Sequence, residues 1–289
     1  MLSGIVPVNN NVKFHEINLI LYHYTDQSGF IGIIENREFW ATKIQYLNDE
    51  NEYKLAIQLS KEYLEELING TKVKITIEKF KYYIDQIKSV SDMHVCVCSL
   101  SEEGDLLSQW RGYSQKLGGY SIGFNASALE FEANKMGFKL MKCIYDPAEQ
   151  KRVISELIDN ELEKYKKKDS YDFEYCDNID FFLEQLAMLS PIIKDSNFKE
   201  EAEWRLVAGV SFGDLNFRPG ASMITPYCKI SLGTNMSNLL NNVIIGHTPH
   251  TSLAVKATQA FLTNQHPPLD DDFTCKFKVS VSSIPFRNW

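Results

Sequence analysis

Apolar residues recur along the chain with the spacing of helices in some segments and of strands in others. Residues 19–23 form an apolar segment that predicts a buried strand, and it runs into a helix over residues 29–36. Residues 53–68 follow the 3.6-residue period of an amphipathic helix, which Asn69 and Gly70 end. Further helices are expected near residues 80–87, 146–168, 177–189 and 253–262.

Strand patterns fill much of the remaining chain. Strands are predicted at residues 93–99, 119–124, 138–145, 201–210, 227–232, 243–245 and 273–281. Strands and helices mix without a repeating βαβ order, so the sequence predicts an α+β fold with mixed or antiparallel sheets and surrounding helices. Without an internal repeat or a low-complexity linker, residues 1–289 are expected to form a single domain. A mainly helical insertion is expected at about residues 146–195.

Charge and composition narrow the class of protein. The 289 residues are 44% apolar, and 30 Lys and Arg against 38 Asp and Glu give a net charge of −8. This balance argues against binding of nucleic acid over a broad basic surface, although it does not exclude a local basic groove. The absence of a long apolar run predicts no membrane span, and the N-terminus lacks the pattern of a signal peptide. Six cysteines are too few for a disulfide scaffold and predict reduced thiols in the cytoplasm.

Common cofactor and metal signatures are missing. Neither a glycine-rich dinucleotide motif, nor a phosphate-binding loop, nor a G-x-S-x-G motif is found. His94, Cys96 and Cys98 alternate on one predicted strand, but a zinc site usually adds a second close pair of ligands. Buried thiols beside a sheet are therefore the expected interpretation, and no metal is expected.

Two polar clusters interrupt apolar segments in the first half of the chain. His23 ends the first predicted strand, and it is either a core histidine with a local partner or a functional one. The segment 105–113 combines Trp110, Arg111 and Tyr113. It is either a short helix that buries Trp110 or part of the wall of a pocket.

A third polar cluster lies at residues 200–207. In a strand, Glu201, Glu203 and Arg205 would face one way, and Trp204 would face the other. The charged face could be an exposed sheet edge. It could equally line a cleft in which Arg205 keeps one carboxylate ionised.

These clusters resemble, in order, a bacterial family linked to abortive phage infection, the AbiGi-like proteins. The resemblance spans about residues 19–287, and the matching segments are LYHYT, FWAT, LNDENE, CSLSEEGDLLSQWRGY, GGYSIGF, FKEEAEWRLV, NNVIIG and SSIPFR.

A second resemblance, to the ADP-ribosyltransferases, implies a chemistry. It implies an ADP-ribosyltransferase-like fold in which His23 binds the adenosine-side ribose of NAD and Ser99 supports the nicotinamide side. Glu203 would be the catalytic carboxylate at the nicotinamide ribose, and Glu201 would activate the acceptor. The other residues assigned to NAD binding are Tyr24, Thr25, Trp110, Arg111, Tyr113 and Arg205.

The expected function is therefore that of an NAD-dependent ADP-ribosyltransferase acting as a toxin or phage-defence effector. The alternatives are an NAD glycohydrolase and a catalytically silent module that binds a nucleotide or a partner. NAD would be the substrate, a protein or nucleic acid the acceptor, and an inhibitory partner could hold the protein inactive. Segments 106–113 and 191–200 would select the acceptor.

Overall fold

The computed structural model describes residues 19–47, 52–114, 118–166, 179–220, 222–267 and 275–285. Ten strands form one mixed sheet, ordered β10-β9-β4-β1-β3-β2-β8-β7, with β6 paired to β3 and β5 paired to β6. The first five strands are β1 (Ile20–Asp26), β2 (Glu38–Lys43), β3 (Val95–Ser101), β4 (Gly119–Asn125) and β5 (Lys139–Lys142). The others are β6 (Glu203–Gly209), β7 (Asn216–Pro219), β8 (Ile224–Ser231), β9 (Leu240–Ile245) and β10 (Lys278–Val281). The α+β prediction fits this arrangement.

Strand β3 is the branch point of the sheet. One edge of β3 pairs with β6 from Val95 to Ser101. The other edge is divided, because Ser101 pairs with Tyr22 of β1 while Val97 pairs with Thr42 of β2. Strands β1 and β2 therefore separate beside the middle of β3, near Ser99.

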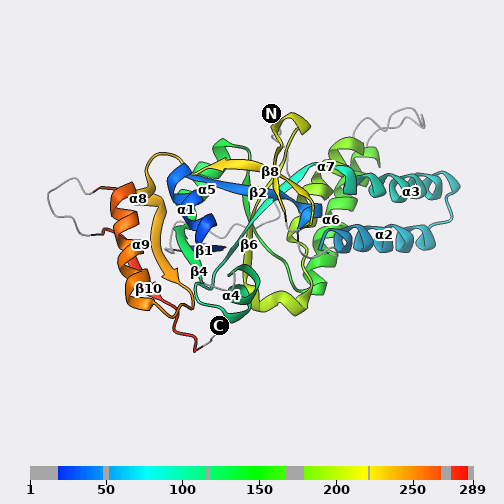
Figure 1. The fold of residues 1–289 in the computed structure, drawn as a ribbon. Helices are drawn as coiled ribbons and strands as arrows, with labels where there is room; N and C mark the ends of the chain where they lie inside the picture. The colour runs from blue at the N-terminus through cyan, green and yellow to red at the C-terminus, as the bar shows by residue number, and fades with distance from the viewer. Residues whose placement is uncertain are drawn as a thin grey trace.

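Helices cover the sheet in two groups, each with its own hydrophobic core (Figure 1). The first group is α1 (Gln27–Asn36), α5 (Ala126–Lys135), α8 (Met236–Leu239) and α9 (Thr251–Gln265). The second group is α2 (Glu52–Gly70), α3 (Lys74–Gln86), α6 (Pro147–Lys166) and α7 (Ile179–Leu189). Side-chain alternation on β6 separates the cores, since Trp204 and Leu206 enter the first and Val207 the second. Charged residues that alternate with Trp204 therefore face the second helical group.

Most expected helices are present, and their ends follow local chemistry. Asp146 accepts a hydrogen bond of 2.9 Å from the backbone N–H of Glu149 and thereby caps α6 at its N-terminus. Helices α6 and α7 fall within the expected insertion at 146–195, although the division into domains stays a prediction. None of the described helices is long and apolar enough to cross a membrane.

The last predicted strand is shorter than its alternation suggests. Among the described residues, β10 covers only Lys278–Val281, and it pairs with β9 alone. The predicted strand therefore does not extend over residues 275–277, and residues 273 and 274 lie outside the described part. Strands β2 and β7 and helix α5 were not predicted, because short elements carry too few residues to show a period.

Candidate functional site

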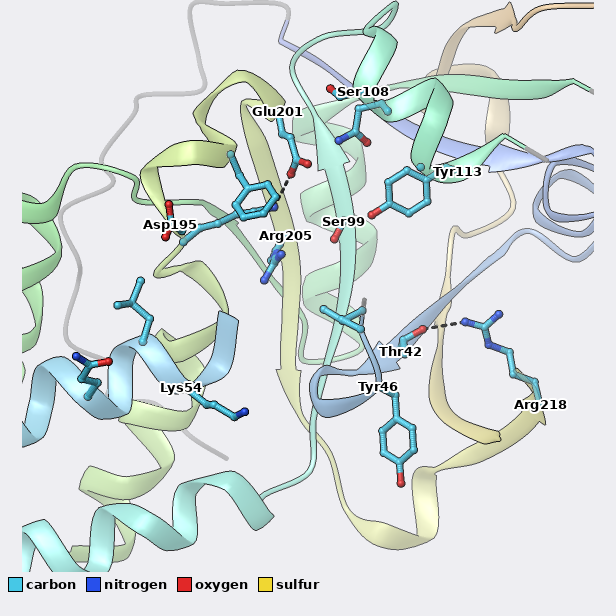
Figure 2. A pocket seen from close by; sticks show the side chains of 17 residues that line it. Thr42, Tyr46, Lys54, Ser99, Ser108, Tyr113, Asp195, Glu201, Arg205 and Arg218 are labelled. Atoms are coloured by element: carbon cyan, nitrogen blue, oxygen red, sulfur yellow. Dashed lines mark hydrogen bonds and ion pairs between the residues drawn. The ribbon is translucent and has the colours of Figure 1, made fainter. Parts of the chain in front are cut away.

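A pocket of about 900 Å³ lies where β3 and β6 meet α2, α4 (Leu107–Tyr113) and the loop that precedes β6 (Figure 2). Four residues predicted from the sequence line it: Ser99, Tyr113, Glu201 and Arg205. Both segments expected to select an acceptor also contribute, through residues such as Gln109 and Phe198. The structure thus brings the polar clusters at residues 105–113 and 200–207 to one cavity.

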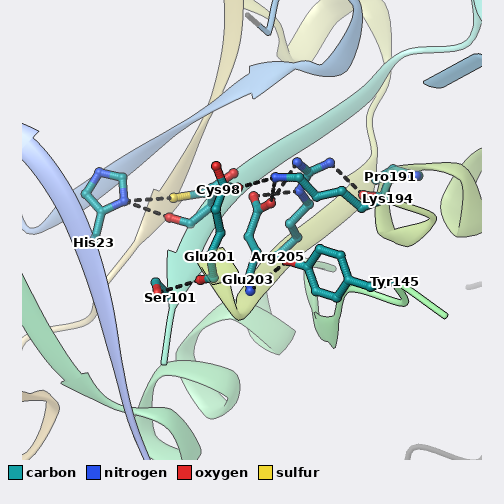
Figure 3. Close-up of polar contacts among 10 residues, drawn as sticks. His23, Cys98, Ser101, Tyr145, Pro191, Lys194, Glu201, Glu203 and Arg205 are labelled. Carbon is teal, nitrogen blue, oxygen red and sulfur yellow. Dashed lines mark hydrogen bonds and ion pairs between the residues drawn. The ribbon is translucent and has the colours of Figure 1, made fainter. Parts of the chain in front are cut away.

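A cluster of buried charges forms the wall of this pocket beneath Glu201 (Figure 3). The Lys194 ammonium group donates to the carboxylates of both Glu201 and Glu203. Arg205 Nε donates to Glu203 Oε1 at 2.8 Å, and Arg205 Nη1 donates to the Pro191 carbonyl at 2.6 Å. The two cations and two carboxylates therefore compensate one another inside the protein.

Glu203 is held in its charged form. Burial alone would raise the pKa of Glu203, but the neighbouring Arg205 and Lys194 lower it from 4.5 to about 2. Of the two interpretations of this strand, the exposed edge is wrong, because β6 lies between β3 and β5 and Arg205 is only 2% exposed. Arg205 does keep a carboxylate ionised, as the cleft interpretation expected.

The lowered pKa of Glu203 predicts a loss of stability in acid. A carboxylate with a depressed folded-state pKa contributes stability above its unfolded pKa, here 4.5, and loses it as the pH falls through about 2. The free energy of unfolding should therefore decrease by a few kcal/mol between these pH values. Urea unfolding at several pH values measures it, and Glu203→Gln should show a shallower decrease over the same range.

Glu201, not Glu203, is the carboxylate on the pocket surface. The Glu201 side chain is 19% exposed and lines the cavity, whereas the Glu203 side chain is 6% exposed and does not. Ala202 has a left-handed backbone with φ of 42°, so Glu201 precedes β6 instead of extending it. The Ser101 hydroxyl fixes this bend by donating to the Glu201 carbonyl at 2.7 Å.

His23 lies on the other side of the branch point. Its Nδ1 donates to the Ser99 carbonyl over 2.9 Å, and its ring packs 4.9 Å from that of Phe39 in the first core. Burial lowers the pKa of His23, and the hydrogen bond to the Ser99 carbonyl raises it by less. The imidazole is therefore neutral at pH 7. His23 is not among the pocket residues, and its position corresponds to a core histidine with a local partner.

Tyr24, Thr25 and Trp110 also lie outside the pocket lining. The Tyr24 hydroxyl donates to the Glu103 carbonyl at 2.6 Å, and its ring meets Trp110 edge-on at 4.9 Å. Thr25 packs against Gly29 at the start of α1, where an added Cβ would lie 1.9 Å from Thr25 Oγ1. These residues hold α4 and the first strand in place.

Trp110 is a buried anchor, and Arg111 is exposed. Trp110 Nε1 donates to Asp105 Oδ1 at 2.7 Å, and the same carboxylate accepts hydrogen bonds from Ser282 and Ser283. Trp110 therefore connects α4 to the segment that follows β10. This arrangement matches the interpretation of the segment as a short helix burying its tryptophan.

Trp110→Phe should lower the free energy of unfolding by about 1–3 kcal/mol, because Asp105 loses a buried donor and the smaller ring leaves a gap. Arg111→Ala, one position further along the same helix, should change stability little, since exposed substitutions rarely matter. Thermal melts of both variants test this. Equal melting temperatures for Trp110→Phe and the wild type would show that Trp110 does not stabilise the fold as an anchor.

The sequence did not reveal the basic residues of the pocket other than Arg205. Lys194 follows the apolar residues Ile192 and Ile193, and a lysine in such a place is a signal that could have identified it. Lys54 and Arg218 come from α2 and β7, and no local pattern distinguishes them from surface residues.

The surroundings of Cys96 and Cys98 on β3 do not favour a metal site. Cys96 and Cys98 lie in the first hydrophobic core, and burial raises the pKa of the Cys98 thiol to about 12. Across the described ranges, no three His, Cys, Asp or Glu side chains gather as a metal site would require.

Comparison with known protein families gives a match over part of the chain. No curated protein and no solved structure matches the chain. Residues 109–206 match a family described as a protein of unknown function (DUF2971). This range contains Lys194, Glu201, Glu203 and Arg205, whereas Lys54 and Arg218 lie outside it. A DUF2971 domain carrying the whole buried charge cluster is thus present in this protein.

Proposed function

We propose that the pocket binds NAD and that the protein transfers its ADP-ribose group to an acceptor, with Glu201 as the catalytic carboxylate. The observation that carries this proposal is a carboxylate on a pocket wall, fixed from beneath by a buried lysine. A carboxylate beside the reacting ribose stabilises the positive charge that forms when a glycosidic bond breaks.

The pocket has the size and lining for such a ligand. Its volume of about 900 Å³ is near the upper end of the usual range for small-molecule sites. Tyr46, Tyr113 and Phe198 line it as well, and these residues are 41%, 44% and 38% exposed, so that a base can stack on their rings. The Ser108 hydroxyl lines it as well, and its oxygen is buried without a hydrogen-bond partner among the described residues. A ribose hydroxyl of the ligand would satisfy it.

The chemical step needs no further reagent. The bond between the ribose C1′ and the nicotinamide nitrogen breaks, and its electron pair remains on the nicotinamide ring. The acceptor oxygen or nitrogen forms the new bond to C1′ and releases its proton, which the Glu201 carboxylate would accept. Glu203 acts indirectly in this scheme, since it holds Lys194 and thereby the Glu201 side chain, and Arg205 in turn donates to Glu203.

This assignment changes the roles expected from the sequence. Glu203 becomes a positioning residue instead of the catalytic carboxylate. His23, Tyr24, Thr25, Trp110 and Arg111 support the pocket from outside its lining. Ser99, Tyr113 and Arg205 stay as candidate contacts, because they line the cavity. A role as a toxin or phage-defence effector rests on the resemblance to the AbiGi-like proteins alone.

The test is incubation of the purified full chain with NAD that carries a label on the adenine side, with and without bacterial lysate. ADP-ribosyl transfer predicts free nicotinamide and a labelled protein or nucleic acid. Nicotinamide with only free ADP-ribose would indicate a glycohydrolase, which uses water as the acceptor. NAD binding without release of nicotinamide would indicate a silent module and contradict the proposal.

A further inference from the structure

The residues that line the pocket differ in chemistry. Glu201, Ser99 and Tyr113 lie in the upper part of Figure 2, and Thr42, Lys54 and Arg218 lie below them, with Lys54 and Arg218 on opposite sides of the view. Glu201 and Glu203 compensate Lys194 and Arg205. Two further basic residues that line the cavity, Lys54 and Arg218, come from α2 and from β7.

Arg218 is fixed in place by neutral groups. Its Nη2 donates to Thr42 Oγ1 at 3.0 Å, and its guanidinium lies 6.0 Å from the centre of the Trp40 ring. That ring is in turn stacked on Tyr227 at 4.6 Å. The Arg218 side chain is therefore held by a hydroxyl and an aromatic pair that supply no negative charge.

The guanidinium of Arg218 also has unused hydrogen-bonding capacity. Its Nε is buried and has no acceptor, and no carboxylate in the described part of the chain pairs with it. A buried donor without an acceptor is costly, and the planar fork of an arginine suits two oxygens of one phosphate or carboxylate. Thr42 accepts a hydrogen bond from one of the nitrogens, and the Arg218 side chain lines the pocket.

We propose that Arg218 forms a phosphate subsite, which binds the diphosphate of the dinucleotide. Lys54 lines the same pocket, and Thr42 and Trp40 orient the guanidinium. The ligand class rests on the proposed function, because a diphosphate between two nucleosides would span from Arg218 towards Glu201. The subsite itself requires only a phosphorylated ligand.

Calorimetry with ADP-ribose tests the subsite without turnover, because this probe contains the diphosphate but no nicotinamide. Arg218→Ala should weaken ADP-ribose binding at least about tenfold, as expected for a lost charge-assisted hydrogen bond. Arg218→Lys should recover part of the affinity, since it keeps the charge but not the fork. Wild-type binding should weaken as salt increases, and the dependence should be smaller in Arg218→Ala.

Lys229→Ala is the matched control. Lys229 lies on the adjacent strand β8, pairs with Glu38 at 2.9 Å and does not line the pocket. Its replacement removes the same charge from the same hairpin and should leave affinity unchanged. Adenosine, which lacks phosphate, should bind wild type and Arg218→Ala equally.

The outcomes separate this inference from the proposed function. Equal ADP-ribose affinity in wild type and folded Arg218→Ala would overturn the subsite, even if the wild type releases nicotinamide. Arg218-dependent binding of ADP-ribose without nicotinamide release would support the subsite and contradict the enzyme proposal. Binding of inorganic pyrophosphate that needs Arg218, with no added affinity from the nucleoside part, would overturn the dinucleotide assignment.

Discussion

Glu201→Gln should reduce nicotinamide release from NAD at least about a hundredfold. The substitution keeps the shape of the side chain but removes the negative charge that would oppose the oxocarbenium ion, and such preorganised charge typically contributes this much. Affinity for ADP-ribose should change little, because the amide still reaches a ribose hydroxyl. The measurement is the initial rate of nicotinamide release, with calorimetry to confirm that the ligand binds.

Two neighbouring carboxylates provide controls for Glu201→Gln. Glu200→Gln, one residue earlier, alters an exposed side chain outside the pocket and should leave the rate at the wild-type value. Glu203→Gln should lower the rate less than Glu201→Gln, because it acts only through the position of Lys194. A wild-type rate in folded Glu201→Gln protein would refute the catalytic assignment, and a larger loss in Glu203→Gln would return that role to Glu203.

Arg205→Met should lower the free energy of unfolding by about 3–5 kcal/mol, the usual cost of leaving a buried charge without its partner. Arg205 is 2% exposed, and its replacement leaves Glu203 facing Lys194 alone and the Pro191 carbonyl without its donor. Denaturant unfolding followed by circular dichroism measures this loss.

A double-mutant cycle shows whether the loss arises from the charge pair. Adding Glu203→Gln to Arg205→Met should recover part of the stability, because the buried carboxylate is then neutral. Arg152→Met breaks exposed ion pairs on α6 with Glu149 and Glu156 and should hardly change the melting temperature. If Arg205→Met were as stable as the wild type, the charge cluster would not hold this part of the fold.

Local periodicity was enough to predict which side chains share a face. The alternation of Glu203 and Arg205 with Trp204 was predicted from sequence and is confirmed, since Trp204 lies in the first core and the charged pair on the opposite face. The long amphipathic helix and the Asp146 cap were also predictable, because both depend on residues within a few turns of each other.

The tertiary structure decided which of those faces forms a pocket. Strand β6 is interior only because β3 and β5 pair with its two edges, and this pairing buries Glu203 while the bend at Ala202 leaves Glu201 at the surface. Likewise, Arg218 and Thr42 are 176 residues apart and meet through the pairing of β2, β8 and β7. A residue pattern sets the direction of a side chain relative to its own strand. The neighbours of that side chain across the sheet depend on contacts between distant segments, which no local period encodes.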